Sequence, residues 1–245
     1  MLRSLLRQLH RVYRSSVKKA LMYVARWMYI LAVTFSIGFL TVHFVRQTAW
    51  YKKHHYGLLL SGSPEQRLRS ATALALVGGE SELLEALKAE EPAVHTVARR
   101  GLEYLWFTAA GKDAFKMVEE SVEASEKEEF KKALSILDRV TAQHPSFAEG
   151  WNRRAAVLWQ TGQFEKSIVD CERALKLNPN HYGALQGLGI CQLQLGEVRE
   201  ACKSLRLALK VSPHDKVTLL SLERCEDFLR TRLQTNQSLH PPDLL

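Results

Sequence analysis

Histidines and clustered carboxylates are the residues of this chain whose chemistry could bind a metal ion or move a proton. Two histidines are adjacent, His54-His55, and three others stand apart at His144, His181 and His214. A metal site needs several such ligands around one point. The adjacent pair directly follows a long apolar stretch and is more typical of an interface, and the other three lie beside prolines, which predicts exposed positions in turns. We therefore expect no metal site.

Six glutamates gather within one short segment, where paired carboxylates could in principle act as acid and base: Glu119, Glu120, Glu123, Glu126, Glu128 and Glu129. Their spacing is more typical of the solvated face of a helix. The sequence also lacks the nucleotide-binding patterns GxxxxGK[ST] and GxGxxG and the hydrolase patterns HExxH and GxSxG. We therefore predict a protein that is not an enzyme and that holds no cofactor.

Four cysteines all lie in the C-terminal half, in segments with a helical pattern: Cys171, Cys191, Cys202 and Cys225. None belongs to a CxxC pair, so neither a zinc site nor a thioredoxin-like site is predicted. Small apolar packing residues are the simplest interpretation, although an even number leaves one disulfide open.

The net charge of +8 on 245 residues is unevenly distributed along the chain. Residues 1–64 contain ten Lys and Arg and no acid, whereas the remaining 24 Lys and Arg are outnumbered by 26 Asp and Glu. A nucleic-acid-binding domain usually carries its bases on the folded part. The distribution therefore argues against a nucleic-acid partner.

Residues 27–45 form an uncharged stretch that predicts a transmembrane helix. Nineteen helical residues span about 28 Å, close to the hydrocarbon thickness of a bilayer, and aromatic residues flank both ends. Residues 1–26 predict a basic amphipathic helix that lies on a membrane surface or acts as a targeting sequence. The excess of bases before the span predicts that the N-terminus stays on the cytosolic, matrix or stromal side. We expect a single-pass membrane protein of the mitochondrion, with the chloroplast or the bacterial inner membrane as alternatives.

Three prolines, Pro145, Pro179 and Pro213, are spaced by 34 residues, which predicts helix-turn-helix units over residues 114–147, 148–181 and 182–215. Small residues recur where the two helices of a unit must approach, as at Gly189, Ala174 and Ala208. The pattern resembles the tetratricopeptide repeat family. The resemblance implies a right-handed α-solenoid with three units over residues 113–215. Together with the apolar stretch, it predicts an all-α protein in which a transmembrane helix precedes the solenoid.

The remaining segments follow from their position around the repeats. Residues 46–62 are expected to be a linker, and residues 63–112 a helical adaptor that either resembles short HEAT repeats or simply packs on the first unit. Residues 216–234 are expected to form a capping helix that covers the last unit with Val217, Leu220, Leu222, Cys225, Phe228 and Leu229. Residues 235–245 are expected to be a loose tail.

The resemblance also implies where a protein partner would bind. In this family, positions 2, 5, 6, 9, 12 and 13 of each unit face a concave groove, and Glu149 takes position 2 of the second unit. The residues that we expect to contact a partner there are Asn152, Arg153, Trp159, Gln160, Gln186, Ile190 and Gln194. Trp159 has an alternative role, packing against a neighbouring helix.

Members of the family that bind chaperone tails use a clamp of lysines, asparagines and arginine. The corresponding positions here hold Val118, Val122, Arg153, Gly183 and Gly187, and none matches. Binding to chaperone C-terminal tails is therefore disfavoured.

These features together predict a membrane-anchored scaffold or adaptor that binds proteins and supports the recruitment or assembly of a complex at an organellar or bacterial membrane. Two alternatives remain open: a constitutive structural subunit of a large membrane complex, and a soluble binding factor released by cleavage.

Overall fold

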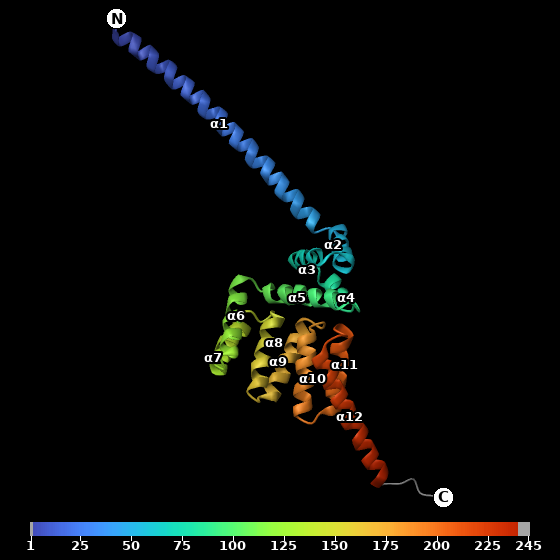
Figure 1. Cartoon of the computed structure of the whole chain (residues 1–245). Coiled ribbons are helices and arrows are strands. Elements are labelled where there is room, and N and C mark those ends of the chain that lie inside the picture. Colours follow the sequence, from blue (N-terminus) through green and yellow to red (C-terminus); the bar gives the residue numbers. More distant parts are fainter. Residues whose placement is uncertain (1, 240–245) are drawn as a thin grey trace. The chain divides into compact units, whose positions relative to one another are not determined.

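The structure is a computed structural model that describes residues 2–239, with side chains for residues 21–232 (Figure 1). The described residues are all-α and contain twelve helices. The chain divides into two compact units, Met1–Lys52 and Lys53–Leu245.

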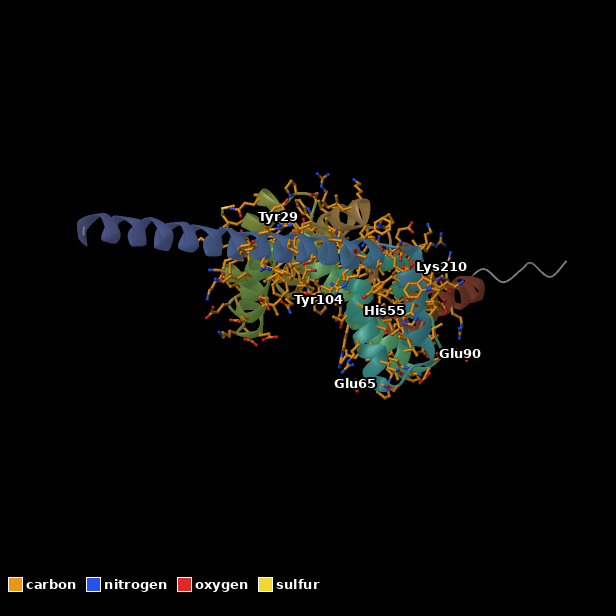
Figure 2. The ribbon with its side chains drawn as sticks, turned by 90° about the horizontal axis from the view of Figure 1, so that it is seen from above. Tyr29, His55, Glu65, Glu90, Tyr104 and Lys210 are labelled. Carbon is orange, nitrogen blue, oxygen red and sulfur yellow. The ribbon has the colours of Figure 1, made fainter. Side chains whose placement is uncertain are left out.

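The N-terminal compact part, Met1–Lys52, consists mainly of helix α1, which runs from Leu2 to Arg46. The helix continues without a break through residue 26, where we expected the surface helix to give way to the span. Its stretch Leu21–Arg46 is 26 residues long and apolar enough to cross a membrane by length and composition, and none of it is buried. Tyr29, labelled on this stretch in Figure 2, is 71% exposed.

The polar side chains of the apolar stretch find partners within their own helix. The hydroxyl of Thr34 donates to the carbonyl of Ile30 at 3.0 Å, and the hydroxyl of Ser36 donates to that of Ala32 at 2.8 Å. Because hydrocarbon supplies no hydrogen bonds, such pairing lowers the cost of placing hydroxyls in a bilayer.

Four helices precede the repeats: α2 (Ala49–Ser61), α3 (Pro64–Leu76), α4 (Glu80–Ala86) and α5 (Pro92–Thr108). The segment 46–62, expected as a linker, thus contains a helix. Helix α3 begins at a capping box in which the amide of Gln66 donates to the Ser63 hydroxyl and the Ser63 amide donates to the Gln66 side chain. The imidazole of His55 on α2, labelled in Figure 2, lies 3.2 Å from the hydroxyl of Ser70 on α3. Leucines from all four helices share one core: Leu59, Leu74, Leu83, Leu87 and Leu102.

The repeat array consists of three helix pairs and a last single helix. The pairs are α6 (Lys112–Glu126) with α7 (Phe130–Gln143), α8 (Ala148–Gln160) with α9 (Phe164–Leu177), and α10 (Tyr182–Gln194) with α11 (Val198–Val211). The second and third pairs lie within the predicted units 148–181 and 182–215, whereas α6 begins at Lys112, ahead of the first predicted unit at residue 114. The single helix is α12 (Lys216–Leu239), which runs beyond residue 234, where we expected the cap to end.

The turn inside each unit requires one residue with left-handed backbone geometry. Gly162 and Gly196 fill this position with φ values of 74° and 78°. In the first repeat unit, Glu128 takes this position with a φ of 60°. The left-handed backbone costs more free energy for glutamate than for glycine, because glutamate has a Cβ.

Small residues allow the paired helices to pack closely. A Cβ added to Gly189 of α10 would lie 2.6 Å from a side-chain carbon of Leu205 on α11. Ala174 on α9 and Ala208 on α11, each on the second helix of its unit, are buried. The predicted packing role of these positions is confirmed.

Helix α12 covers the last unit with only part of the predicted set. Leu222, Cys225 and Leu229 pack against α11, but Val217, Leu220 and Phe228 are exposed by 56%, 57% and 53%. The prediction that those three cover the unit is wrong, because they lie on another face of the helix. The four cysteines are free and buried, as expected for packing residues.

Candidate functional site

Helix α5 lies across the ends of the array helices, as Figure 1 shows. The guanidinium of Arg99 donates to the Asp215 carboxylate at 2.8 Å and to the Ser212 hydroxyl at 3.1 Å, in the turn before α12. The hydroxyl of Tyr182, at the start of α10, donates to the Glu103 carboxylate at 3.1 Å. We call this surface, formed by α5 and the turns before α10 and α12, the clamped edge. The adaptor thus reaches the third unit and the cap, in addition to the first unit, on which one of the two alternatives placed it.

A buried carboxylate, Glu149 at the start of α8, connects α8 to the N-cap of α10 at the clamped edge. It accepts from Nε2 of His181 at 2.8 Å, from Nε of Arg153, and from the Asn152 amide at 3.4 Å. Nδ1 of His181 accepts the backbone N–H of Ala184, so Nε2 carries the proton that bonds Glu149. Burial alone would raise the pKa of Glu149, but the bond from His181 and the charge of Arg153 outweigh it and lower the pKa.

Two sequence expectations are wrong at this point. His181 was expected in an exposed turn, but it is buried and its ring stacks on Trp106 of α5 at 4.5 Å. Glu149 was expected to face the groove, but only 3% of its side chain is exposed. Both errors have the same reason. Helix α5 covers the turn before α10 and the start of α8, and the spacing of residues in the sequence does not show that α5 packs there.

Glu80 on α4 completes the clamped edge. Its carboxylate accepts from the indole N–H of Trp106 at 2.6 Å and from the Asn178 amide at 3.0 Å. Farther along α5, the rings of His95 and His214 stack at 4.8 Å. Within the described residues, no group of three or more His, Cys, Asp or Glu is placed to hold a metal ion.

Away from the clamped edge, the C-terminal halves of α6 and α8, the first helices of the first two repeat units, border a hollow of about 200 Å³. Arg153 and Gln160 line it together with Ala156 and, from α6, Val122 and Glu126. The Gln160 side chain accepts from the Ser125 hydroxyl at 2.8 Å across the hollow. We use the word groove for the face of α6, α8, α10 and α12 that includes this hollow.

The seven predicted partner contacts fall into two groups. Asn152, Arg153 and Gln186 already bond within the protein: the first two to Glu149, and Gln186 to Asp215 and Thr218 at 2.7 Å each. The guanidinium of Arg153 also lies 4.4 Å from the ring of Phe107. The others are accessible. Trp159 is 42% exposed, Gln160 and Gln194 are exposed, and Ile190 is half-buried.

Sequence reasoning missed the groove residues of α12. The register continues from Tyr182 to Lys216, so Val217, Leu220 and Phe228 take groove positions 2, 5 and 13 of an incomplete fourth unit. Their exposure agrees with that placement. The signal was present in the spacing, but the expectation of a cap assigned these residues to the core.

A family model described as tetratricopeptide repeat matches residues 148–181, which are the second predicted unit. The match identifies residues 148–181 as a tetratricopeptide repeat. Such repeats form scaffolds for protein–protein interaction.

Known tetratricopeptide repeat proteins are similar over part of the chain. A TPR repeat-containing protein of Rhizobium etli is 28% identical over 157 residues, which cover 64% of this chain and 71% of the relative. Anaphase-promoting complex subunit 3 of Schizosaccharomyces pombe is 26% identical over 104 residues, which cover 41% of this chain and 16% of that subunit.

Among solved structures, the first TPR of Spaghetti (RPAP3) bound to an HSP90 peptide is similar with a TM-score of 0.47 and 19% identity. The likeness covers 48% of this chain and 93% of that one.

Proposed function

We propose that this tetratricopeptide repeat protein is a membrane-anchored scaffold that binds a protein partner in the groove and supports the recruitment or assembly of a complex at a membrane. The observation that carries the proposal is the combination of an unburied apolar stretch, Leu21–Arg46, with an array whose groove is accessible. A signal sequence has similar length and composition, so retention of the stretch is the first point to test.

Carbonate extraction tests the anchor. The full-length protein should stay in the membrane pellet, because a 26-residue apolar helix is not released by high pH. Recovery of the full-length chain in the soluble fraction would contradict the anchor. A mature N-terminus beyond residue 45, read by mass spectrometry, would replace the anchor with a processed soluble factor.

We place the anchor in an organellar membrane, the mitochondrion first, because residues 1–26 are rich in Arg and contain no acid, as targeting sequences are. The chloroplast and the bacterial inner membrane are the alternatives. Proximity labelling from the C-terminus, with markers for each compartment, distinguishes them and identifies the neighbouring proteins.

The accessible contacts Trp159, Gln160, Ile190 and Gln194 are the residues that we propose for the partner. A chaperone tail remains disfavoured, since the positions that a carboxylate clamp requires hold Val118, Val122 and two glycines, Gly183 and Gly187. Capture of partners by the full chain, compared between the wild type and a Trp159→Ala variant, tests this assignment.

A further inference from the structure

The hollow between α6 and α8 is apolar at its base and acidic at its rim. Val122, Leu137, Ala156 and Val157 line it, and Glu126 stands at its edge. Glu119 lies seven residues earlier on the same face of α6, two turns away, and takes the same repeat position as Arg153 in the next unit. Both glutamates are exposed.

Neither Glu126 at the hollow nor Glu119 two turns away has an ion-pair partner within the part of the chain that the structure describes. The lysine that pairs nearby, Lys132, bonds Glu129 at 2.9 Å on the far side of the turn. Two unpaired carboxylates beside an apolar hollow attract cations and repel anions, because their potentials add at the surface between them.

The arginine that lines the hollow does not offset this charge. Arg153 is paired with the buried Glu149, and its guanidinium lies over the ring of Phe107. Its charge is therefore already matched inside the protein. Among the described residues that line the hollow, an acidic peptide would find no unmatched cation.

Trp159 adds a surface suited to a cation or an apolar side chain. It lies three residues after Ala156 on α8, close to the hollow on the same helix, and is 42% exposed. Indole rings bind Lys and Arg side chains over their faces as well as apolar groups. Farther along the groove, α12 presents the exposed apolar side chains of Val217, Leu220 and Phe228.

We propose that the groove selects a partner segment that combines basic side chains, placed against Glu119 and Glu126, with apolar side chains that fill the hollow and lie on α12. The inference rests on the proposed function, since it names the partner chemistry of the same groove. It sets this groove apart from one that recognises the carboxylates of an acidic tail.

The test uses three synthetic 16-residue peptides with the same leucine positions and with Lys, Gln or Glu at the remaining positions, tethered to a sensor surface. The full chain in zwitterionic detergent flows over them. The lysine peptide should bind at least about tenfold more tightly than the glutamate peptide. The double variant Glu119→Gln/Glu126→Gln should weaken lysine-peptide binding roughly five- to tenfold, as the loss of two ion pairs would.

The matched control is Glu165→Gln/Glu172→Gln, which removes the same charge from exposed positions on α9, the second helix of its unit. It should leave binding within about twofold of the wild type, since charges distant from the site are screened. An equal loss in both double variants would overturn the inference, because net charge would then explain the binding.

The remaining outcomes separate this inference from the proposed function. Equal binding of all three peptides, or preference for the glutamate peptide, combined with a loss of binding on Trp159→Ala, would overturn the charge selectivity and keep the groove as a binding site. No binding of any peptide, together with partner capture that is unchanged in Trp159→Ala, would remove the groove as the site and the inference with it.

Discussion

The clamped edge and the groove meet on helix α8, but they hold polar side chains in different ways. At the start of α8, Glu149 is buried and bonded to His181 and Arg153. At the end of α8, Gln160 is exposed and shares one hydrogen bond with Ser125. The first set is fixed because α5 excludes water from it, and the second can exchange its bonds with a partner.

This difference revises which groove residues can bind a partner. Asn152 and Arg153 occupy groove positions, but both are bonded to Glu149. Replacing them would disturb the connection between α8 and the N-cap of α10 as well as any partner contact. Trp159, Gln160 and Gln194 are free of that ambiguity, so mutations there report on binding.

The largest effect is expected for Glu149→Ala, at the centre of the clamped edge. The change leaves the buried His181 N–H and the half-buried Arg153 charge without their acceptor, and the free energy of unfolding should fall by about 3 kcal/mol. Thermal unfolding followed by circular dichroism measures it. Gln160→Ala on the same helix should change stability by less than about 0.5 kcal/mol. Similar losses in the two variants would contradict the distinction between edge and groove.

Acid should weaken the clamped edge through two of its carboxylates, Glu149 and Asp215. Burial opposes ionisation of Glu149 and Asp215, but their hydrogen bonds and the nearby Arg153 and Arg99 outweigh it, so both pKa values are lowered from 4.5 and 3.8. A lowered pKa in the folded state contributes stability that is complete above the unfolded-state pKa. That stability is lost as the pH falls through the folded-state pKa. Unfolding midpoints should be steady from pH 7 to about 5 and fall below about 4.5, and Glu149→Gln should reduce the slope.

Arg99→Ala should have the next largest effect, since it detaches α5 from the turn before α12. It removes a half-buried ion pair with Asp215 and a hydrogen bond to Ser212, and we expect a loss of about 1–2 kcal/mol in urea unfolding. The neighbouring Arg100 is exposed, so Arg100→Ala is the matched control and should be close to neutral. Equal effects would show that Arg99 does not secure the edge.

Much of the array could be predicted from the sequence, because its determinants are local and periodic. The prolines spaced by 34 residues and the small residues Gly189, Ala174 and Ala208 report contacts between neighbours in the chain. The predicted second and third units each contain one helix pair, and the first differs because α6 begins at Lys112.

The clamped edge could not be predicted in the same way, because its contacts join residues far apart in the chain. Arg99 and Asp215 are 116 residues apart, and Glu80 and Asn178 are 98 apart. Nothing in the local pattern near His181 shows that Trp106 will cover it. The exposed face of α12, in contrast, could have been predicted, because the 34-residue register continues into this helix. The error came from assigning every apolar residue of a terminal helix to the core.

Glu128→Gly should produce a smaller change, and in the opposite direction. This residue lies in the turn inside the first unit, at neither the clamped edge nor the hollow, and its φ of 60° is unfavourable for glutamate. Glycine, which the other two units use, should raise stability by about 0.5–1 kcal/mol. Gly162→Ala should lower it by a similar amount. A destabilised Glu128→Gly variant would mean that the Glu128 side chain contributes more than its backbone costs.

Trp159→Leu should have the smallest effect on stability and a large effect on binding, which gives the sharpest contrast between the two regions. The indole is 42% exposed and leucine keeps part of its apolar contact. The free energy of unfolding should therefore change by no more than about 0.5 kcal/mol, as measured by thermal unfolding. Capture of partners by the full chain should fall severalfold, because a flat aromatic anchor contributes strongly to a protein interface. If stability fell as far as in Arg99→Ala while capture was unchanged, Trp159 would belong to the packing between α8 and its neighbours, and the groove would have to be defined by Gln194, Leu220 and Phe228 instead.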